Sequence, residues 1–327
     1  SNHHVYLIPG FFGFANFGDF KYFAHVREHL REWLDARGVN AAIHYAPSFP
    51  TASLRRRAGR VMEIVAETAK DDDGPIHLIG HSTGGLDARL AVAPRASLLT
   101  SVDHEPFAQR VRSVAAFFTS LLGQRLLALL SLTTVHAIRL GSIPMPALVV
   151  LAGALGSTGA LRSISGGVLD QVFQQVLKDF DQERRTTLQE YFGYVIHDQT
   201  LLVQLTPEGL DLFNAMATER EGVRRGCVVA QAKPPALGRN LEVGLDPVHQ
   251  ANYGLFRALY QLASTLGEHL LPELTQAQRD RLIAAYGRLP TARANDAMVP
   301  LLSQVWGDVL HAAWADHLDV IGHFHDP

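Results

Sequence analysis

Short apolar runs alternate with amphipathic stretches along the first part of the chain. The runs have the length of strands and lie at residues 4–9, 41–45, 76–79 and 111–118, with a later one at 223–230. Between them, apolar residues recur at helical spacing over 22–37, from Thr51 or Ser53 to Ala69, and over 84–91. Because strands that alternate with helices form covered parallel sheets, this pattern predicts an α/β fold: a mostly parallel sheet with helices on both faces.

The alternation stops after residue 118. Between residues 121 and 167 there are only three charged side chains, all of them arginines. We therefore divide the chain into a core domain, residues 1–118 and 223–327, and an apolar helical insertion, residues 119–222. The longest uncharged run, 140–161, contains two prolines and four glycines, which favour an apolar insertion over a transmembrane span.

One predicted strand leads into a predicted helix through a serine that lies between glycines. Residues 80–84 read Gly-His-Ser-Thr-Gly and follow the apolar run at 76–79 directly. In this G-x-S-x-G pattern the glycines permit a sharp, strained turn that lifts the serine hydroxyl clear of the sheet. The context predicts that Ser82 is a nucleophile and not an idle serine in a glycine-rich turn.

A nucleophilic serine needs a basic histidine, and the histidine needs a carboxylate that orients it. In chains with this turn the partners follow in the order serine, acid, histidine. Asp296 lies downstream in a loop of small residues, and His317 lies where the last strand should end. His323 and His325 are closer to the chain end, where they would be harder to hold rigidly. We expect His311 in a helix, so the spacing favours His317 as the base.

Acyl transfer through a serine also needs N–H donors for the oxyanion. One expected donor is the N–H of Thr83, the residue after the serine. The other is the N–H of Phe11, in the glycine-containing loop after the first apolar run. The rings of Phe11, Phe12, Phe14 and Phe17 also predict an apolar wall for an acyl chain.

Four parts of the sequence carry a resemblance to a known family. They read Pro-Gly-Phe-Phe-Gly-Phe at 9–14, Gly-His-Ser-Thr-Gly-Gly-Leu-Asp-Ala-Arg at 80–89, Leu-Thr-Pro-Glu-Gly at 205–209 with Phe213 and Asn214, and Asn-Asp-Ala-Met-Val-Pro at 295–300 with Asp-His-Leu-Asp at 316–319. Together they resemble bacterial triacylglycerol lipases of the α/β-hydrolase superfamily. The resemblance spans most of the chain and fades at about 119–200 and 231–290.

The resemblance implies an α/β-hydrolase fold with a helical lid or cap. It implies Ser82 as nucleophile, Asp296 as acid and His317 as base. It also implies that the N–H groups of Phe11 and Thr83 form the oxyanion hole.

The chain departs from the family at two places and matches a possible calcium ligand at a third. Ala297 replaces the glycine usual after the acid, and residues 119–123 read Thr-Ser-Leu-Leu-Gly where the family has Thr-Pro-His and a glycine. The family often binds a structural calcium ion through the acid two residues after the histidine, which is Asp319 here. A single carboxylate is not a calcium site, so calcium is a secondary expectation and the predicted chemistry requires no cofactor.

Composition narrows the classes of partner. The chain has 327 residues, 47% of them hydrophobic, a net charge of −3 and a single cysteine, Cys227. No basic face is implied, so nucleic acid is not an expected partner. The lone cysteine excludes an internal disulfide and a cysteine-based metal site, and we expect it in the core. No signal peptide is visible, which favours a cytoplasmic location, or a secreted one where a signal has been removed.

The sequence therefore predicts a lipase-like serine ester hydrolase that forms an acyl-enzyme and acts on ester or lipid substrates. If the apolar insertion is a moving lid, the protein acts at a lipid–water interface. A fixed cap and a dimer interface are alternatives for the same insertion. Other functions left open are a short-chain carboxylesterase, an aliphatic-polyester hydrolase, an acyltransferase and a non-catalytic hydrolase-fold binding protein.

Overall fold

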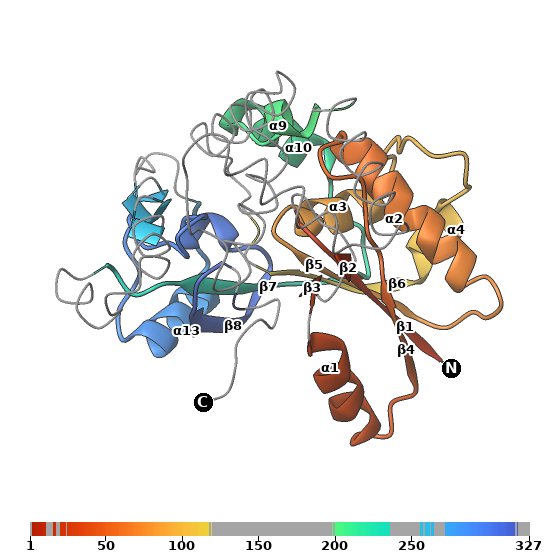
Figure 1. The fold of residues 1–327 in the computed structure, drawn as a ribbon, viewed down its shortest axis with the longest axis horizontal. Coiled ribbons are helices and arrows are strands. Elements are labelled where there is room, and N and C mark those ends of the chain that lie inside the picture. Colours follow the sequence, from red (N-terminus) through yellow and green to blue (C-terminus); the bar gives the residue numbers. More distant parts are fainter. Residues whose placement is uncertain are drawn as a thin grey trace, which may run out of the picture.

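Six parallel strands form the central sheet of the computed structural model, in the order β4-β1-β5-β6-β7-β8 (Figure 1). The strands are β1 (His3–Ile8), β4 (Ala41–Tyr45), β5 (Ile76–His81), β6 (Val111–Phe117), β7 (Arg224–Gln231) and β8 (Asp308–Trp314). A small antiparallel pair, β2 (Asn16–Phe17) and β3 (Phe20–Lys21), follows β1 in the chain. The sheet confirms the predicted α/β class.

The structure describes residues 2–10, 16–17, 20–23, 25–117, 119, 198, 200–235, 256–257, 259–261, 263–264, 272–317 and 319, with only the backbone at 16–17, 20–21 and 202. Most of the predicted insertion at 119–222 therefore lies outside the described residues, and so does the predicted helical content of its apolar part.

Helices cover both faces of the sheet (Figure 1). They are α1 (Val26–Asp35), α2 (Leu54–Thr68), α3 (Thr83–Val92), α4 (Glu105–Arg110), α9 (Thr200–Gln204), α10 (Pro207–Met216) and α13 (Gln276–Tyr286), with a 3₁₀ turn, η2 (Leu301–Gln304). Helices α2 and α3 lie on one face and α1 lies on the other.

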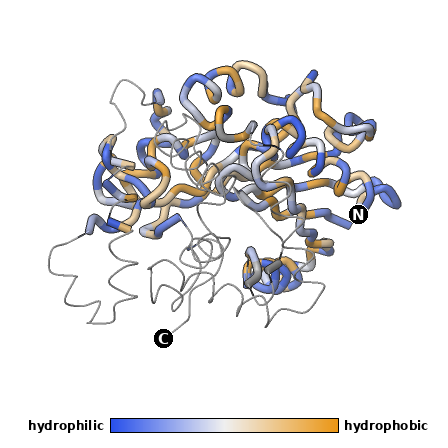
Figure 2. The backbone as a smooth tube through the Cα atoms, turned by 45° about the horizontal axis from the view of Figure 1, so that its top comes forward, coloured by the Kyte–Doolittle hydropathy of each residue, from blue (hydrophilic) through white to orange (hydrophobic). Residues whose placement is uncertain are grey.

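Strand β1 shows why the apolar runs are nearly continuous. Tyr6 and Ile8 pack into the core cluster beneath α2 and α3, whereas Val5 and Leu7 pack into the cluster on the α1 side. A strand that is buried on both faces needs apolar residues at successive positions, without the alternation of a half-exposed strand. Figure 2 accordingly shows hydrophobic stretches through the middle of the molecule and hydrophilic ones mostly toward its rim.

The described end of the predicted insertion packs against the sheet domain. Leu201 of α9, Leu210 and Phe213 of α10, and Leu205 between the two helices belong to the same core cluster as residues of α2 and α3. Thr206 caps α10, since its side chain accepts a hydrogen bond from the N–H of Gly209 (3.1 Å). These two helices are therefore fixed to the core on the α2 side.

Two sequence expectations need correction. The helix expected from residue 22 begins only at Val26, because Phe23 and His25 have positive φ angles of 58° and 61°. His311 was expected in a helix, and it lies in the edge strand β8, which pairs in parallel with β7. The segment is a short apolar run, and periodicity alone does not separate strand from helix in runs of that length.

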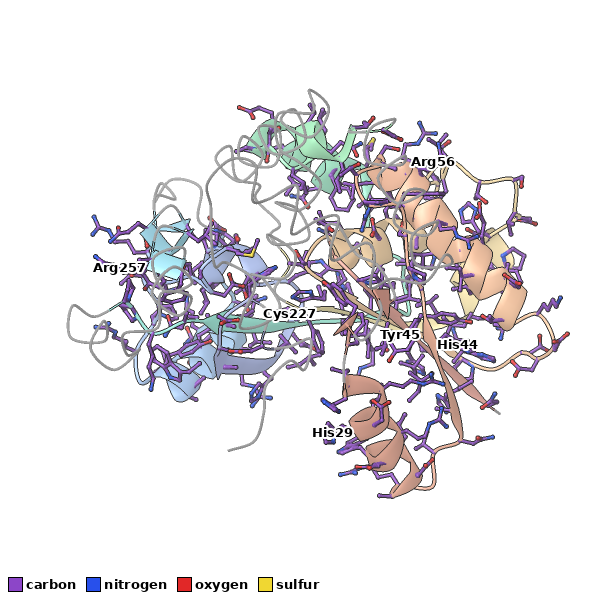
Figure 3. The ribbon with its side chains drawn as sticks, viewed as in Figure 1. His29, His44, Tyr45, Arg56, Cys227 and Arg257 are labelled. Atoms are coloured by element: carbon purple, nitrogen blue, oxygen red, sulfur yellow. The ribbon has the colours of Figure 1, made fainter. Side chains whose placement is uncertain are left out.

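Cys227 has the core position that its apolar neighbours predict. It lies on β7, next to the edge strand β8 (Figure 3), and is fully buried. Burial raises the pKa of its thiol to about 11, so the thiol stays protonated. Cys227 therefore acts as a small hydrophobic residue.

Candidate active site

Ser82 occupies the turn between β5 and α3 in a strained conformation. Its backbone has φ 53° and ψ −127°. Positive φ at a residue with a side chain costs about 1–3 kcal/mol and persists only where the surroundings enforce it. Here the N–H of Ser82 donates to the carbonyl of Phe117 (2.8 Å). The Ser82 carbonyl accepts from Thr119 Oγ1 (2.8 Å) and from the N–H of Gly85 (3.0 Å).

Glycines make room for this turn. A Cβ atom on Gly80 would lie 2.2 Å from the carbonyl oxygen of Gly84. One on Gly84 would lie 2.3 Å from the carbonyl oxygen of Ile8, and one on Gly10 would lie 2.7 Å from Ser82 Cβ. Real Cβ atoms do not approach so closely. The glycine spacing in the sequence is therefore a steric requirement of the turn.

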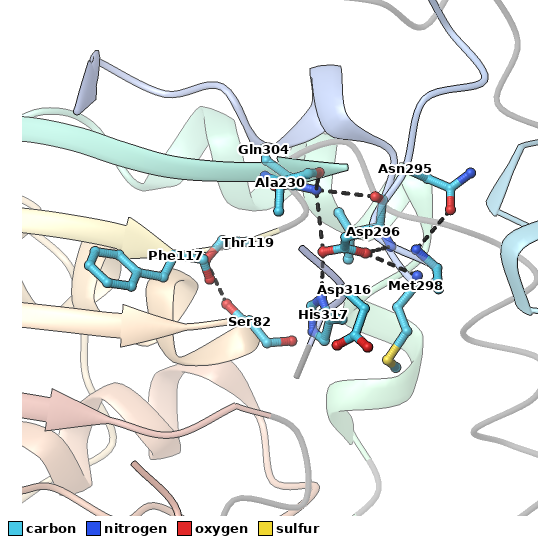
Figure 4. Close-up of polar contacts among 12 residues, drawn as sticks. Ser82, Phe117, Thr119, Ala230, Asn295, Asp296, Met298, Gln304, Asp316 and His317 are labelled. Carbon is cyan, nitrogen blue, oxygen red and sulfur yellow. Dashed lines mark hydrogen bonds and ion pairs between the residues drawn. The ribbon is translucent and has the colours of Figure 1, made fainter. Parts of the chain in front are cut away.

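Asp296 and His317 form a buried pair at the same end of the sheet (Figure 4). His317 Nδ1 donates to Asp296 Oδ2 at 2.7 Å, and the His317 N–H donates to the Asp296 carbonyl at 2.9 Å. An ionised carboxylate only accepts hydrogen bonds, so Nδ1 carries the proton and Nε2 is the basic nitrogen of the ring.

Backbone donors orient the side chain of Asp296. Asp296 Oδ1 accepts from the N–H of Met298 (3.0 Å) and the N–H of Val299 (2.6 Å). Between Asp296 and Met298, Ala297 takes φ 76°, the left-handed conformation that glycine adopts without strain. This is the position where the chain departs from the lipase pattern, and the asparagine before the acid supports it: Asn295 Oδ1 accepts from the Ala297 N–H at 2.8 Å.

Gln304 is a site residue that sequence reasoning missed. Its fully buried side chain donates from Nε2 to Asp296 Oδ2 (3.3 Å), to the Val299 carbonyl (3.1 Å) and to the Ala230 carbonyl (3.2 Å). Its Oε1 accepts from the Ala230 N–H at 2.9 Å. Gln304 thus joins the acid loop to the end of β7. A polar residue in the apolar segment after the acid motif was the available signal.

A buried ion pair lies beneath the turn. Arg57 of α2 and Asp87 of α3 are both fully buried, with Arg57 Nη2 2.7 Å from Asp87 Oδ2. Arg57 Nη2 also lies 3.4 Å from Thr83 Oγ1 and 3.4 Å from the carbonyl oxygen of Gly10. The guanidinium therefore links α2 and the start of α3 to Gly10, the residue before Phe11.

Ser82 follows β5 and His317 follows β8, with β6 and β7 between those two strands, and the serine side chain points toward the histidine (Figure 4). His81 connects the two segments, because its Nε2 donates to the carbonyl of His317 at 2.9 Å. The structure thus brings together the three residues that the sequence proposes as nucleophile, acid and base.

The other predicted site residues are described only in part. Thr83 is the first residue of α3, so its N–H has no carbonyl acceptor within the helix. Phe11, Phe12 and Phe14 lie outside the described residues, and Phe17 is described only as backbone in β2.

Asp319 exchanges two hydrogen bonds with Asp316, each between a backbone N–H and a carboxylate oxygen. Its Oδ2 accepts from the Asp316 N–H (2.8 Å), and its own N–H donates to Asp316 Oδ1 (3.1 Å). Burial and the nearby Asp316 charge raise the pKa of Asp319. No group of three or more metal-ligating side chains occurs among the described residues, so calcium at Asp319 stays a prediction.

Among the residues that the structure describes, no helix is long and apolar enough to cross a membrane.

Comparison with known proteins identifies the fold. No protein-family model and no curated protein sequence matches the chain. The structure of EstA from Clostridium botulinum matches with a TM-score of 0.55 at 19% identity, over 99% of this chain and 84% of EstA. The Staphylococcus hyicus lipase matches with a TM-score of 0.52 at 16% identity, over 98% of this chain and 89% of the lipase. Lipase 1 from Pelosinus fermentans gives 0.52 at 14% identity, over 98% and 93%.

These matches cover nearly the whole chain. The chain therefore has the α/β-hydrolase fold found in bacterial lipases and esterases, as the sequence resemblance predicts. At such low identities the similarity establishes the fold and leaves the substrate to be argued from the site.

Gln304→Leu should destabilise the protein by about 3 kcal/mol, because it leaves a buried N–H and carbonyl of Ala230 unpaired and removes a donor from Asp296. Urea unfolding measures the loss. The control is Gln109→Leu, at an exposed glutamine of α4, which should change stability by less than about 0.5 kcal/mol. Equal effects of the two substitutions would contradict the role of Gln304.

Gly84→Ala should cost about 3 kcal/mol, because its Cβ would collide with the carbonyl oxygens of Ile8 and Pro9. Gly38→Ala is the control: its φ of 66° is strained for alanine, but a Cβ there meets nothing within 4 Å. We expect Gly38→Ala to cost only about 1 kcal/mol. Thermal or urea unfolding compares the two, and a Gly84 variant no less stable than the control would contradict the steric account.

Proposed function

We propose that this chain, an α/β-hydrolase by fold, is a serine ester hydrolase of the lipase type. The observation that carries the proposal is Ser82 held in a strained turn with its side chain toward a buried Asp296–His317 pair (Figure 4). Strain of this kind is retained where the hydroxyl must be presented to a substrate. The similarity to bacterial lipase structures supports the same conclusion.

In the proposed mechanism Ser82 Oγ attacks the ester carbonyl while His317 Nε2 accepts the hydroxyl proton. Asp296 holds the ring in the Nδ1–H tautomer and stabilises the imidazolium that forms. His317 then gives the proton to the departing alcohol, which leaves an acyl group on Ser82. Water, deprotonated by His317, attacks the acyl-enzyme, and His317 returns that proton to Ser82 Oγ as the acid leaves.

The proposed oxyanion hole consists of the N–H groups of Thr83 and Phe11. Thr83 supports this role because it begins α3, where the helix dipole adds to the N–H in stabilising negative charge. Phe11 directly follows Gly10, whose backbone packs against Ser82. Phe12, Phe14 and Phe17 are proposed to line the acyl site.

The proposed substrates are acyl esters, including lipid esters, and the apolar insertion at 119–222 is proposed as a lid or cap. Its long uncharged sequence suits a surface that is covered in water and opens at lipid. The proposed chemistry proceeds with the chain's own residues, so a calcium ion at Asp319 would be structural.

Ser82→Ala should lower kcat/KM for p-nitrophenyl esters by at least about 1,000-fold, since only binding and oxyanion stabilisation remain. The control is Ser101→Ala, at an exposed serine, which should retain full activity. Near-full activity of Ser82→Ala would overturn the assignment of the nucleophile. A wild-type chain without activity would move the proposal to an acyltransferase or a non-catalytic binding protein.

The acyl-chain length that the protein prefers distinguishes a lipase from a short-chain carboxylesterase. Esters from acetate to palmitate should be compared below and above the concentration at which each aggregates. A preference for long chains with a jump on aggregation is expected for a lipase with a moving lid. Activity confined to short, dissolved esters would instead indicate a short-chain carboxylesterase with a fixed cap.

A further inference from the structure

The hydroxyl of Tyr22 is a buried polar group that the proposed mechanism does not use. It lies between two segments that the mechanism does use. The N–H of Gly10 donates to Tyr22 Oη at 3.0 Å, and Tyr22 Oη lies 2.6 Å from His81 Nδ1. His81 Nε2 in turn lies 2.9 Å from the carbonyl oxygen of His317. Tyr22, His81 and His317 are all buried.

The hydrogen atoms in this series can take one consistent direction. A carbonyl oxygen only accepts, so His81 Nε2 carries a proton and donates to His317. A neutral His81 then has a bare Nδ1, which accepts from the Tyr22 hydroxyl, while Tyr22 Oη accepts from Gly10. Burial, and then the nearby His317, hold the pKa of His81 well below its usual value, which keeps the ring neutral.

Gly10 is the point at which this series reaches the oxyanion side of the site. Its N–H is held by Tyr22, and its carbonyl oxygen lies 3.4 Å from Arg57 Nη2. A Cβ on Gly10 would lie 2.7 Å from Ser82 Cβ, so its backbone is in direct contact with the proposed nucleophile. The next residue in the chain is Phe11, the proposed second oxyanion donor.

We propose that Tyr22 and His81 are positioning residues that set the oxyanion segment against the nucleophile turn and the backbone of the base. The hydroxyl of Tyr22 fixes Gly10, and the His81 ring carries the same alignment to His317. This inference rests on the proposed ester hydrolysis. It assigns a role in catalysis to two residues that do not touch the reacting atoms.

The reasoning predicts an effect on kcat and little effect on substrate binding. A displacement of the oxyanion donors weakens interactions that matter most in the transition state. Loss of a whole donor costs about 100- to 1,000-fold, so loss of a residue that only aligns one should cost less.

The first variant is Tyr22→Phe, which removes a single oxygen atom. We expect kcat for a p-nitrophenyl ester to fall about tenfold while KM changes by less than about threefold. The inhibition constant of an alkylboronic acid, whose adduct with the serine resembles the tetrahedral intermediate, should rise by about the same factor as kcat falls.

Tyr6→Phe is the matched control. Tyr6 is a fully buried tyrosine on β1, and its hydroxyl makes a 2.7 Å hydrogen bond to Thr68 Oγ1 outside the site. Both substitutions remove one buried hydrogen-bonded hydroxyl, so urea unfolding should show similar losses of stability. Only Tyr22→Phe should change kcat and boronic acid affinity. A Tyr22→Phe variant with kcat and boronic acid affinity within twofold of wild type would overturn the proposal.

The second pair of variants is His81→Gln and His81→Leu. The glutamine carbonyl can accept from Tyr22 and its amide can donate to the His317 carbonyl, whereas leucine can do neither. We expect His81→Gln to retain at least about fivefold more kcat than His81→Leu. Equal kcat in the two variants would contradict the positioning role.

One measurement on the wild-type protein separates this proposal from the proposed function. Nitrogen-15 NMR of the histidine rings at neutral pH should show His81 as the neutral Nε2–H tautomer. The Nδ1–H tautomer would overturn the positioning role of Tyr22 and His81 whatever the activity, and whether or not the variants fold. If the wild type is active, Ser82→Ala is inactive and Tyr22→Phe is unaffected, the positioning role alone is overturned and the proposed function stands. A wild type that hydrolyses no ester would overturn the proposed function, and with it the role of Tyr22 and His81 in catalysis.

Discussion

The positive φ of Ser82 is the constraint on which the rest of the site depends. A residue with a side chain stays at φ 53° only if its neighbours make every relaxed alternative worse. Hydrogen bonds fix both sides of the Ser82 backbone, at Phe117 and at Thr119. The glycines around the turn then let β1 and α3 close on it. The strain is therefore stored where the hydroxyl is presented.

The parallel sheet explains how distant segments reach this turn. The carboxyl ends of β1, β5, β6, β7 and β8 lie at one end of the sheet, so the segments that leave them meet there. Each segment is tied to the next by a buried polar side chain. Arg57 and Tyr22 hold Gly10, His81 joins the turn to His317, and Gln304 joins Asp296 to β7. Buried donors and acceptors that are fully paired favour one geometry, since each broken bond is costly.

The sequence predicted the parts of the site that are local. The strand, the glycines and the helix at residues 76–91 are adjacent in the chain, and the acid and histidine follow in the order typical of chains with this turn. It missed Gln304 and Tyr22, because the hydrogen bonds that join them to Ala230 and to His81 span 74 and 59 residues, and a pairing of that length leaves no local pattern. It placed His311 in a helix because only the pairing of β8 with β7 decides the conformation of that short run.

Reaction with a fluorophosphonate, which phosphonylates an activated serine, tests the central claim most directly. We predict a single adduct on the peptide that contains Ser82, and no adduct in the Ser82→Ala variant. An unmodified protein, or an adduct on another residue that persists in Ser82→Ala, would contradict the account. An activated Ser82 hydroxyl should attack the phosphorus of the probe as it attacks an ester carbonyl.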